Sequence, residues 1–288
     1  MCDQEQLAAM SRKGLSRRGF AKLGAVAAVA ACTAPDEADA QQGVQAEVAA
    51  RFDAPGGTMD AYFVHPVTGK HPAVIVWPDI AGLRDSFMAM GRRLSREGYA
   101  VLVLNPYYQD GEAPQFDDFD AWREQGGMEK VAPWRAKLTP ENVMGAAKAA
   151  VEWLDKQDSV DKTKGIGTQG YCMGGPFTVW SAAGAPERIK AAASFHGGGL
   201  VGEDATSPVK MLGQTQASFL FAIARNDDRT APTEKDVLKA AAAEAGRPAE
   251  IEVYRADHGW TVDDSPAFDF DAADRAWARL LNLYKTAL

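Results

Sequence analysis

The chain has 288 residues, a formal net charge of −8 at pH 7, and a composition that is 46% hydrophobic and 24% charged. This length and apolar content suffice for one sizeable domain with a large buried core. An acidic body without a basic cluster argues against nucleic acid as a partner. The three cysteines and four histidines show no CxxC or HExxH spacing, so we expect no metal site.

The first forty residues have the pattern of an export signal. Residues 16–22 read SRRGFAK, with the arginine pair at Arg17 and Arg18, and an apolar, alanine-rich run over residues 23–31 follows directly. This run is too short to remain in a bilayer as a spanning helix. The sequence therefore predicts the twin-arginine export machinery as a partner, a periplasmic or secreted location, and no stable membrane span.

Two processing sites compete in this segment. Ala38-Asp39-Ala40 has the small-x-small pattern of signal cleavage, whereas the sequence VAAC ending at Cys32 resembles a box for lipid attachment, which would anchor the chain. We favour cleavage after Ala40. Residues 1–40 are then the signal segment and residues 41–288 a single domain in which Cys172 is the remaining thiol, so that no intrachain disulfide can form.

The first predicted element after the signal is a hairpin over residues 44–64, where apolar and polar residues alternate around Ala-Pro-Gly-Gly. Predicted strands then alternate with predicted helices. Strands are expected at 73–77, 99–104, up to 168, 191–195, 219–224 and 250–254, and helices at 85–97, 139–155, 176–183, 233–245 and 266–287. This alternation predicts a doubly wound, mostly parallel sheet with helices on both faces. The irregular segment 105–138 is interpreted as a cap or rim loop over the site, or as a solvated connection.

The most informative stretch is Gly165 to Gly175, which reads GIGTQGYCMGG. Gly170-x-Cys172-x-Gly174 has the spacing of a nucleophile elbow, a sharp strand-to-helix turn that exposes the reactive atom. The amide of the next residue, Met173, would then point toward a developing oxyanion. Many free cysteines are only small buried hydrophobes. Acidic residues and a histidine follow in the order that this elbow uses, which favours the nucleophile.

A thiol nucleophile needs a base and a group that orients the base. His258 follows the last predicted strand and is the candidate base. Asp227 and Asp228 both follow the strand at 219–224, and we prefer Asp227, which lies three residues after Ala224, although Asp228 remains open. Ile80 is placed to supply a second oxyanion amide. His196, in FHGGG, follows a different strand and is assigned a structural or rim position.

Together GYCMGG, the WPDIAG loop at residues 77–82 and DHGW at 257–260 resemble the dienelactone hydrolase family of the α/β-hydrolase fold, over residues 44–288. The resemblance implies hydrolysis of a small ester or lactone by a Cys-His-Asp triad without a cofactor. It points to Cys172, His258, and Asp227 or Asp228 as the triad. It also implies that the amides of Ile80 and Met173 form the oxyanion hole.

The same resemblance places Asp79 where the family has a glutamate near the thiol, and it places Trp260 beside the substrate. Facing Cys172, the Asp79 carboxylate would hold the resting thiol neutral by like-charge repulsion. The family's arginine a few residues after the histidine has no counterpart in residues 259–265, which argues against a muconolactone-type substrate. Two other functions stay open: a catalytically idle periplasmic small-molecule binding protein, and a redox protein that uses the single thiol of Cys172.

Overall fold

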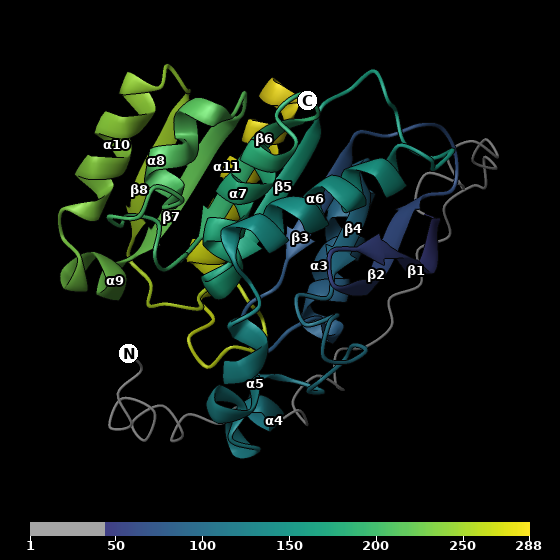
Figure 1. Cartoon of the computed structure of the whole chain (residues 1–288), viewed down its shortest axis with the longest axis horizontal. Helices are drawn as coiled ribbons and strands as arrows, with labels where there is room; N and C mark the ends of the chain where they lie inside the picture. Colours follow the sequence, from purple (N-terminus) through teal and green to yellow (C-terminus); the bar gives the residue numbers. More distant parts are fainter. Residues whose placement is uncertain (1–43) are drawn as a thin grey trace, which may run out of the picture. The chain divides into compact units, whose positions relative to one another are not determined.

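Residues 44–288 are those that the computed structural model describes, and they contain one eight-stranded sheet (Figure 1). The strand order is β1-β2-β4-β3-β5-β6-β7-β8. The strands are β1 (Gln45–Ala54), β2 (Gly57–Pro66), β3 (Ala73–Trp77), β4 (Ala100–Leu104), β5 (Ile166–Tyr171), β6 (Ile189–Phe195), β7 (Ser218–Ala224) and β8 (Ala249–Tyr254). The pairs β1·β2 and β2·β4 are antiparallel, and the other pairs are parallel. The predicted α/β-hydrolase fold is confirmed.

Helices cover both faces of this sheet, as the alternation of elements predicts (Figure 1). The longer ones are α3 (Asp85–Arg96), α6 (Pro140–Leu154), α7 (Gly175–Gly184), α10 (Glu234–Glu244) and α11 (Phe270–Ala287). The shorter ones are α4 (Phe119–Glu124), α5 (Gly127–Arg135), α8 (Pro208–Met211) and α9 (Arg225–Thr230), with 3-10 turns η1 (Cys172–Gly174) and η2 (Leu212–Gln214). One hydrophobic cluster joins α6, α7 and α10 to the sheet, and another joins α3 and α11 to its opposite face.

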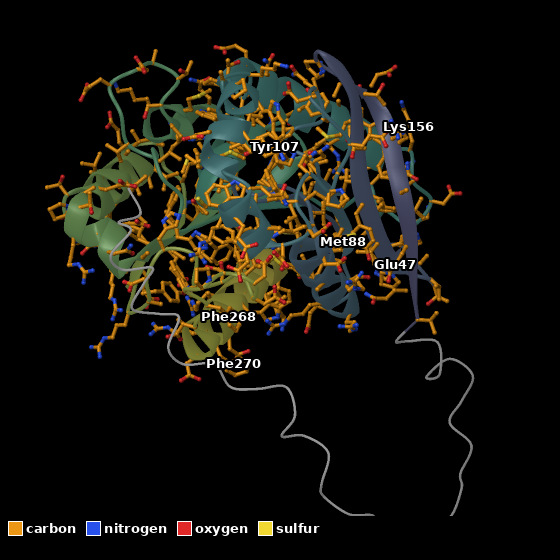
Figure 2. All side chains as sticks on the ribbon, turned by 90° about the horizontal axis from the view of Figure 1, so that it is seen from below. Glu47, Met88, Tyr107, Lys156, Phe268 and Phe270 are labelled. Carbon is orange, nitrogen blue, oxygen red and sulfur yellow. The ribbon has the colours of Figure 1, made fainter. Side chains whose placement is uncertain are left out.

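The central strands are buried along their whole length because helices cover both of their faces. Every residue of β3, β4 and β5 is buried. Such strands read as continuous apolar runs, which is why the sequence identifies β3 and β4. At the rim the pattern changes: Phe268 and Phe270, at the start of α11, are 40% and 72% exposed (Figure 2). Because the central strands are buried, their carboxyl ends, from which the site is built, are held in place.

Local capping explains where two of the predicted helices begin. The Thr139 side chain accepts a hydrogen bond from the amide of Asn142, and Pro140 takes the first position of α6, as predicted. The last helix, α11, begins at Phe270, four residues later than predicted, because the Asp269 side chain caps the amide of Ala272. The segment 105–138 is more regular than predicted, since it contains α4 and α5.

Candidate active site

The predicted elbow joins β5 to α7 and carries Cys172 at its apex. Cys172 has φ +52°, a left-handed conformation that is costly for a residue with a side chain. The neighbouring glycines make this turn feasible. A Cβ atom at Gly170 would lie 2.0 Å from the carbonyl oxygen of Gly174, and one at Gly174 would lie 2.5 Å from that of Trp77. The glycine spacing is therefore a steric requirement of the turn.

The structure brings His258 and Asp227 together. His258 Nδ1 lies 2.7 Å from Asp227 Oδ2, and the His258 amide donates to Asn226 Oδ1 at 2.8 Å. Both acceptors lie on α9, directly after β7. The neighbouring carboxylate of Asp228 instead pairs with Lys235 on α10. Of the two aspartates that the sequence left open, the geometry therefore places Asp227 against the histidine.

The surroundings of His258 favour its charged form. Burial opposes protonation of the ring, but the Cys172 thiolate and the Asp227 carboxylate outweigh it and raise the pKa of His258 far above its ordinary value. A further acid lies nearby, since burial and the charge of Asp227 raise the pKa of Glu234, in the first turn of α10, to about 6. The arrangement suits an imidazolium paired with a thiolate.

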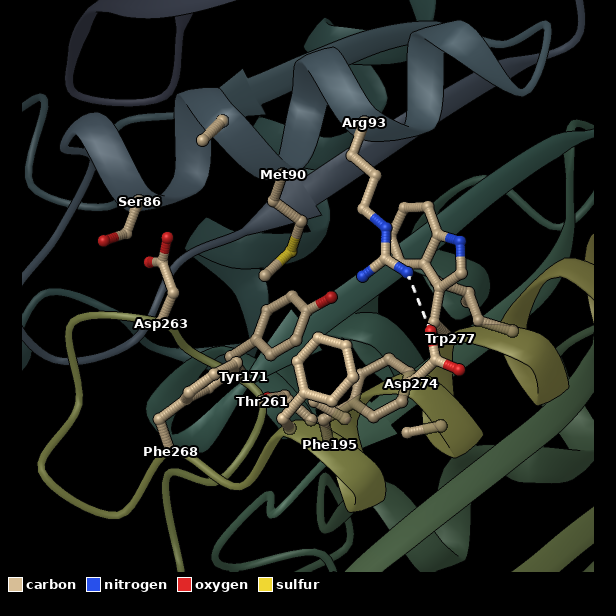
Figure 3. Close-up of a pocket in the computed structure, with 15 residues that line it drawn as sticks. Ser86, Met90, Arg93, Tyr171, Phe195, Thr261, Asp263, Phe268, Asp274 and Trp277 are labelled. Carbon is tan, nitrogen blue, oxygen red and sulfur yellow. Dashed lines mark hydrogen bonds and ion pairs between the residues drawn. The ribbon is translucent and has the colours of Figure 1, made fainter. Parts of the chain in front are cut away.

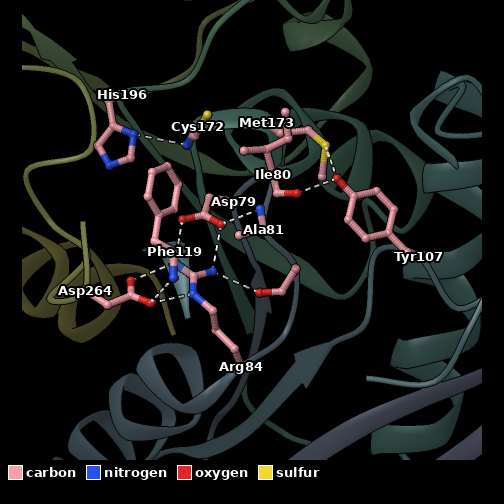
Figure 4. A network of polar contacts seen from close by, with 11 residues as sticks. Asp79, Ile80, Ala81, Arg84, Tyr107, Phe119, Cys172, Met173, His196 and Asp264 are labelled. Carbon is pink, nitrogen blue, oxygen red and sulfur yellow. Dashed lines mark hydrogen bonds and ion pairs between the residues drawn. The ribbon is translucent and has the colours of Figure 1, made fainter. Parts of the chain in front are cut away.

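His196 lies beside the thiol residue and contacts its backbone. It is fully buried, its φ is +40°, and its Nδ1 accepts the backbone N–H of Cys172 at 3.2 Å (Figure 4). Its Nε2 therefore carries the proton and donates to Thr261 Oγ1 at 2.8 Å. Burial and the nearby charge of His258 hold the pKa of His196 well below its ordinary value. His196 thus lies in a structural position, as predicted, and there it binds the backbone of the elbow through the Cys172 amide.

Trp260 has a different place from the one predicted. It is fully buried, stacks on Tyr254 with ring centroids 5.2 Å apart, and meets the edge of His196 at 5.0 Å. Trp260 and Tyr254 belong to the hydrophobic cluster that joins α3 and α11 to the sheet. A side chain without exposed surface does not reach a substrate, so packing beneath the His258 loop replaces the predicted substrate contact of Trp260.

The loop after β3 lies against the elbow and presents Ile80. The Tyr107 hydroxyl donates to the Ile80 carbonyl at 2.7 Å and lies 3.4 Å from the Met173 sulfur (Figure 4). Among the described residues, no acceptor is bonded to the Ile80 amide. Burial raises the pKa of Tyr107, so its hydroxyl remains a neutral donor. The two predicted oxyanion residues, Ile80 and Met173, thus flank one tyrosine.

Asp79 does not face the thiol in the way predicted. Its two carboxylate oxygens accept hydrogen bonds from Arg84 at 2.8 Å and 3.0 Å, and Oδ1 also accepts the Ala81 amide at 2.9 Å. Among the described residues it forms no hydrogen bond with Cys172. Asp79 is 3% exposed and Arg84 1%, so this ion pair is buried. The idea that Asp79 holds the resting thiol neutral by direct contact is wrong for this conformation.

Arg84 also binds the loop that carries His258. Its Nε and Nη2 donate to the two oxygens of Asp264, each at 2.7 Å. Asp264 Oδ2 in turn accepts the amide of Phe119, the first residue of α4, at 3.0 Å. One buried guanidinium therefore connects three parts of the chain (Figure 4). They are the loop after β3 that carries Ile80, called the oxyanion loop below, the loop that carries His258, and segment 105–138, called the covering segment below. The sequence analysis missed Arg84, because a single arginine before a helix carries no recognisable pattern.

The covering segment packs directly on the oxyanion residues. A third hydrophobic cluster unites both α4 and α5 with the loop after β3. Its buried members are Ile80, Ala81, Tyr107, Phe116, Trp122 and Val131, and Phe119, Trp134, Leu138 and Met173 pack against them. Segment 105–138 is therefore part of the wall around the oxyanion loop, which accords with the interpretation of it as a cap rather than as a solvated connection.

A separate cavity of about 180 Å³ opens between α3 and α11, on the face of the sheet that these two helices cover (Figure 3). Met90, Tyr171, Phe195 and Trp277 provide much of its apolar lining, and Thr261 contributes to its wall. The cavity lies behind the elbow, because Tyr171 precedes Cys172 and Thr261 holds His196. His258 and Asp227 are not part of this lining.

The described residues contain neither a metal-binding cluster nor a membrane-spanning helix. Within residues 44–288, no group of three or more His, Cys, Asp or Glu side chains could hold a metal ion. In the same range, no helix has the length and apolar character needed to cross a membrane. The predicted signal, with Arg17, Arg18 and Cys32, lies outside the described residues.

Several known proteins are similar to this chain in sequence and in fold. A relative named carboxymethylenebutenolidase in Yersinia pestis is 26% identical over 236 residues, covering 80% of this chain and 84% of its own. One of the same name in Synechocystis is 26% identical over 234 residues, covering 79% and 91%. A dienelactone hydrolase structure from Klebsiella pneumoniae superposes with a TM-score of 0.69 at 24% identity, covering 84% of this chain and 99% of that one.

A second solved structure, a dienelactone hydrolase-like promiscuous phosphotriesterase from metagenomic libraries, gives a TM-score of 0.64 at 24% identity, with coverage of 84% and 99%. At these identities the structures show the shared fold alone. The family model for dienelactone hydrolases matches residues 59–288, which include the elbow, Asp227 and His258. The chain therefore belongs to the dienelactone hydrolase family.

Proposed function

We propose that the protein hydrolyses a small ester or lactone through a thioester on Cys172. The observation that carries this proposal is the strained Cys172 at the elbow, together with the 2.7 Å contact between His258 and Asp227, which lie in the segments directly after β8 and β7. Both loops leave the same edge of the sheet as β5 because these strands run parallel. In this fold, ligands bind at the carboxyl ends of the strands.

The reaction divides into two balanced steps. The Cys172 thiolate attacks the carbonyl carbon of the substrate, and the resulting oxyanion accepts hydrogen bonds from the amides of Ile80 and Met173. As the intermediate collapses, the carbon–oxygen bond to the alcohol breaks, and His258 gives its proton to the leaving oxygen. Water then attacks the thioester while His258 takes a proton from it, and the acid leaves with the thiolate restored.

Relatives of this chain are named carboxymethylenebutenolidases and, in Bradyrhizobium, a 2-oxo-3-(5-oxofuran-2-ylidene)propanoate lactonase, and these names support a lactone or ester as the substrate. For this chain we propose the broader class of small esters and lactones. A binding protein or a single-thiol redox protein has no need for a histidine that is oriented by an aspartate beside the cysteine. The oriented pair His258–Asp227 therefore favours hydrolysis over both alternatives.

Hydrolysis of p-nitrophenyl esters of graded acyl length tests this function. We expect Cys172→Ala to lower kcat by at least about a thousandfold, because nucleophile losses in triads reach about a millionfold. Mass spectrometry of the wild type quenched during turnover should find the added acyl mass on the peptide that contains Cys172. A folded alanine variant that retained a tenth of the wild-type kcat would exclude the covalent mechanism. A thiol-peroxide assay on the same samples tests the redox alternative.

A further inference from the structure

The guanidinium beneath the oxyanion loop has no hydrogen left for a substrate. Nε and Nη2 bind Asp264, Nη1 and Nη2 bind Asp79, and Nη1 also donates to the Gly82 carbonyl at 3.1 Å. These contacts use all five N–H groups of an arginine. Two carboxylates facing one guanidinium leave an excess of one negative charge in the buried cluster next to the oxyanion loop.

The covering segment adds further negative charge. Residues 105–138 contain seven acidic and four basic side chains. Three of the four basic residues are engaged within the segment: Lys137 pairs with Asp110, Arg123 pairs with Asp120, and Lys130 donates to Gln125. The fourth, Arg135, is exposed at the end of α5, where its Nη1 lies 3.9 Å from the Met128 sulfur. The segment therefore has a net charge of −3, and Arg135 is its one cation whose charge acts on the Tyr107 hydroxyl.

Apart from His258 itself, the loop that carries this histidine supplies no cation either. Four residues beyond His258, Val262 is 1% exposed and belongs to the core on the α3 and α11 face. The charged side chains on residues 259–269 are all acidic: Asp263, Asp264 and Asp269. A carboxylate on a bound substrate would lose its hydration there, and the nearest cation, the His258 ring, is already paired with Asp227. A charge without a free partner of this kind is strongly disfavoured.

We propose that the acyl group accepted by Cys172 is uncharged, so that the substrates are neutral esters or lactones rather than lactones that bear a carboxylate. This inference rests on the proposed thiol hydrolysis and specifies its substrate class. Asp79 and Asp264 act as specificity-determining residues, because they occupy the one buried cation beside the oxyanion loop. The aromatic cluster of α4 and α5, which packs against Ile80 and Met173, suits an apolar acyl chain.

Two matched substrates test the proposal on the unaltered enzyme. Mono(4-nitrophenyl) glutarate carries a free carboxylate, and its methyl ester has the same acyl chain without the charge. We expect kcat/KM to be at least about 30-fold higher for the methyl ester, as one uncompensated charge a few ångströms away gives at moderate effective dielectric. If the two esters react within threefold of each other, the inference is wrong. If neither reacts, and neutral esters of other lengths also fail, the proposed hydrolysis itself is wrong.

Variants identify the source of the selectivity. Asp79→Asn should raise kcat/KM for the anionic ester relative to the neutral one by roughly tenfold, since it removes one negative charge beside the site. Asp158→Asn, an exposed position in the turn between α6 and β5, removes the same charge at the opposite edge of the sheet and should leave the ratio unchanged. An equal effect of both variants would contradict the local origin. A selective loss of the anionic ester in Arg135→Gln would overturn the proposal, because Arg135 would then be a carboxylate receptor.

Discussion

Two adjacent aspartates on α9 differ in partner, and this difference predicts unequal kinetic effects. Asp227 holds His258 Nδ1 at 2.7 Å, whereas Asp228 pairs with Lys235. Asp227→Asn should therefore lower kcat by about a hundredfold to ten-thousandfold, because an asparagine no longer fixes the tautomer and charge of the histidine. Asp228→Asn is the matched control, and it should keep kcat within about threefold. The reverse order would assign the triad acid to Asp228.

The charge of His258 depends on Cys172, which titration can show directly. Burial opposes the charge of His258, but the interactions with Cys172 and Asp227 outweigh it and raise the pKa of His258 to about 11. Removal of the thiolate in Cys172→Ala should lower this pKa, since one of the two anions is lost and burial still opposes the charge.

Nitrogen-detected NMR of the imidazole rings measures this titration residue by residue. His196 serves as an internal reference, because its burial lowers its pKa and it should stay neutral in both proteins. An unchanged His258 titration in Cys172→Ala would mean that the thiol is uncharged in the resting enzyme, and it would separate the ion pair from the triad geometry.

Individual residues were predictable where a short motif carries them. The GxCxG spacing indicates Cys172 and Met173, because sterics require glycines at fixed offsets. His196 and Arg84 are different: their partners Thr261 and Asp264 lie 65 and 180 residues away in the chain. Such contacts depend on the tertiary arrangement of loops that are distant in the chain, and a short sequence motif does not predict this arrangement. The same limit explains the wrong contacts predicted for Asp79 and Trp260.

At the scale of elements, Arg84, directly before α3, links the loop after β3 to the loop that carries His258, and its loss should destabilise the fold. Arg84→Met leaves the buried Asp79 and the partly buried Asp264 without their partner, so we expect the free energy of unfolding to fall by about 3–5 kcal/mol at neutral pH. Urea unfolding measures this change. Arg93→Met, on the same helix, removes a half-exposed pair with Asp274 and should cost about 1 kcal/mol or less.

The destabilisation by Arg84→Met should depend on pH. Burial raises the pKa of Asp264, but Arg84 outweighs it and leaves the pKa below its ordinary value. A carboxyl with a depressed folded-state pKa stabilises the protein above its unfolded pKa, and this stabilisation is lost as pH falls through the folded pKa. The difference between wild type and Arg84→Met should therefore shrink below about pH 4. A difference that stays constant down to pH 3 would contradict an electrostatic role.

Elements with a strong period or a continuous apolar run were predicted to within a few residues. The helices α4, α5 and α9 were not predicted, because they span only 6, 9 and 6 residues. Their sequences are rich in polar residues, and α5 contains Pro133, so local propensity gives no clear signal. Tertiary packing stabilises these helices, as the cluster around Trp122 and Tyr107 indicates for the covering segment.

At the scale of the whole molecule, the parallel sheet assembles from segments far apart in the chain. Strand β3 pairs with both β4 and β5, and the order of the sheet differs from the order of the sequence at this point. The fold is complete only when residues up to β8 have been made. Export after folding, as the arginine pair at Arg17 and Arg18 predicts, suits such a chain. With the proposed cleavage after Ala40, it would deliver an enzyme whose one thiol, Cys172, needs no disulfide partner.

The export prediction is tested by following the chain in cells. The wild type should appear outside the cytoplasm, shortened by about forty residues, with esterase activity in the same fraction. Replacement of Arg17 and Arg18 by lysine keeps the charge but removes the arginine pair, so the full-length precursor should stay in the cytoplasm. Arg12→Lys, a matched change outside the pair, should be exported normally. Amino-terminal mass analysis then decides between Gln41 and a lipid-modified Cys32, and an unprocessed wild type in the cytoplasm would refute the signal.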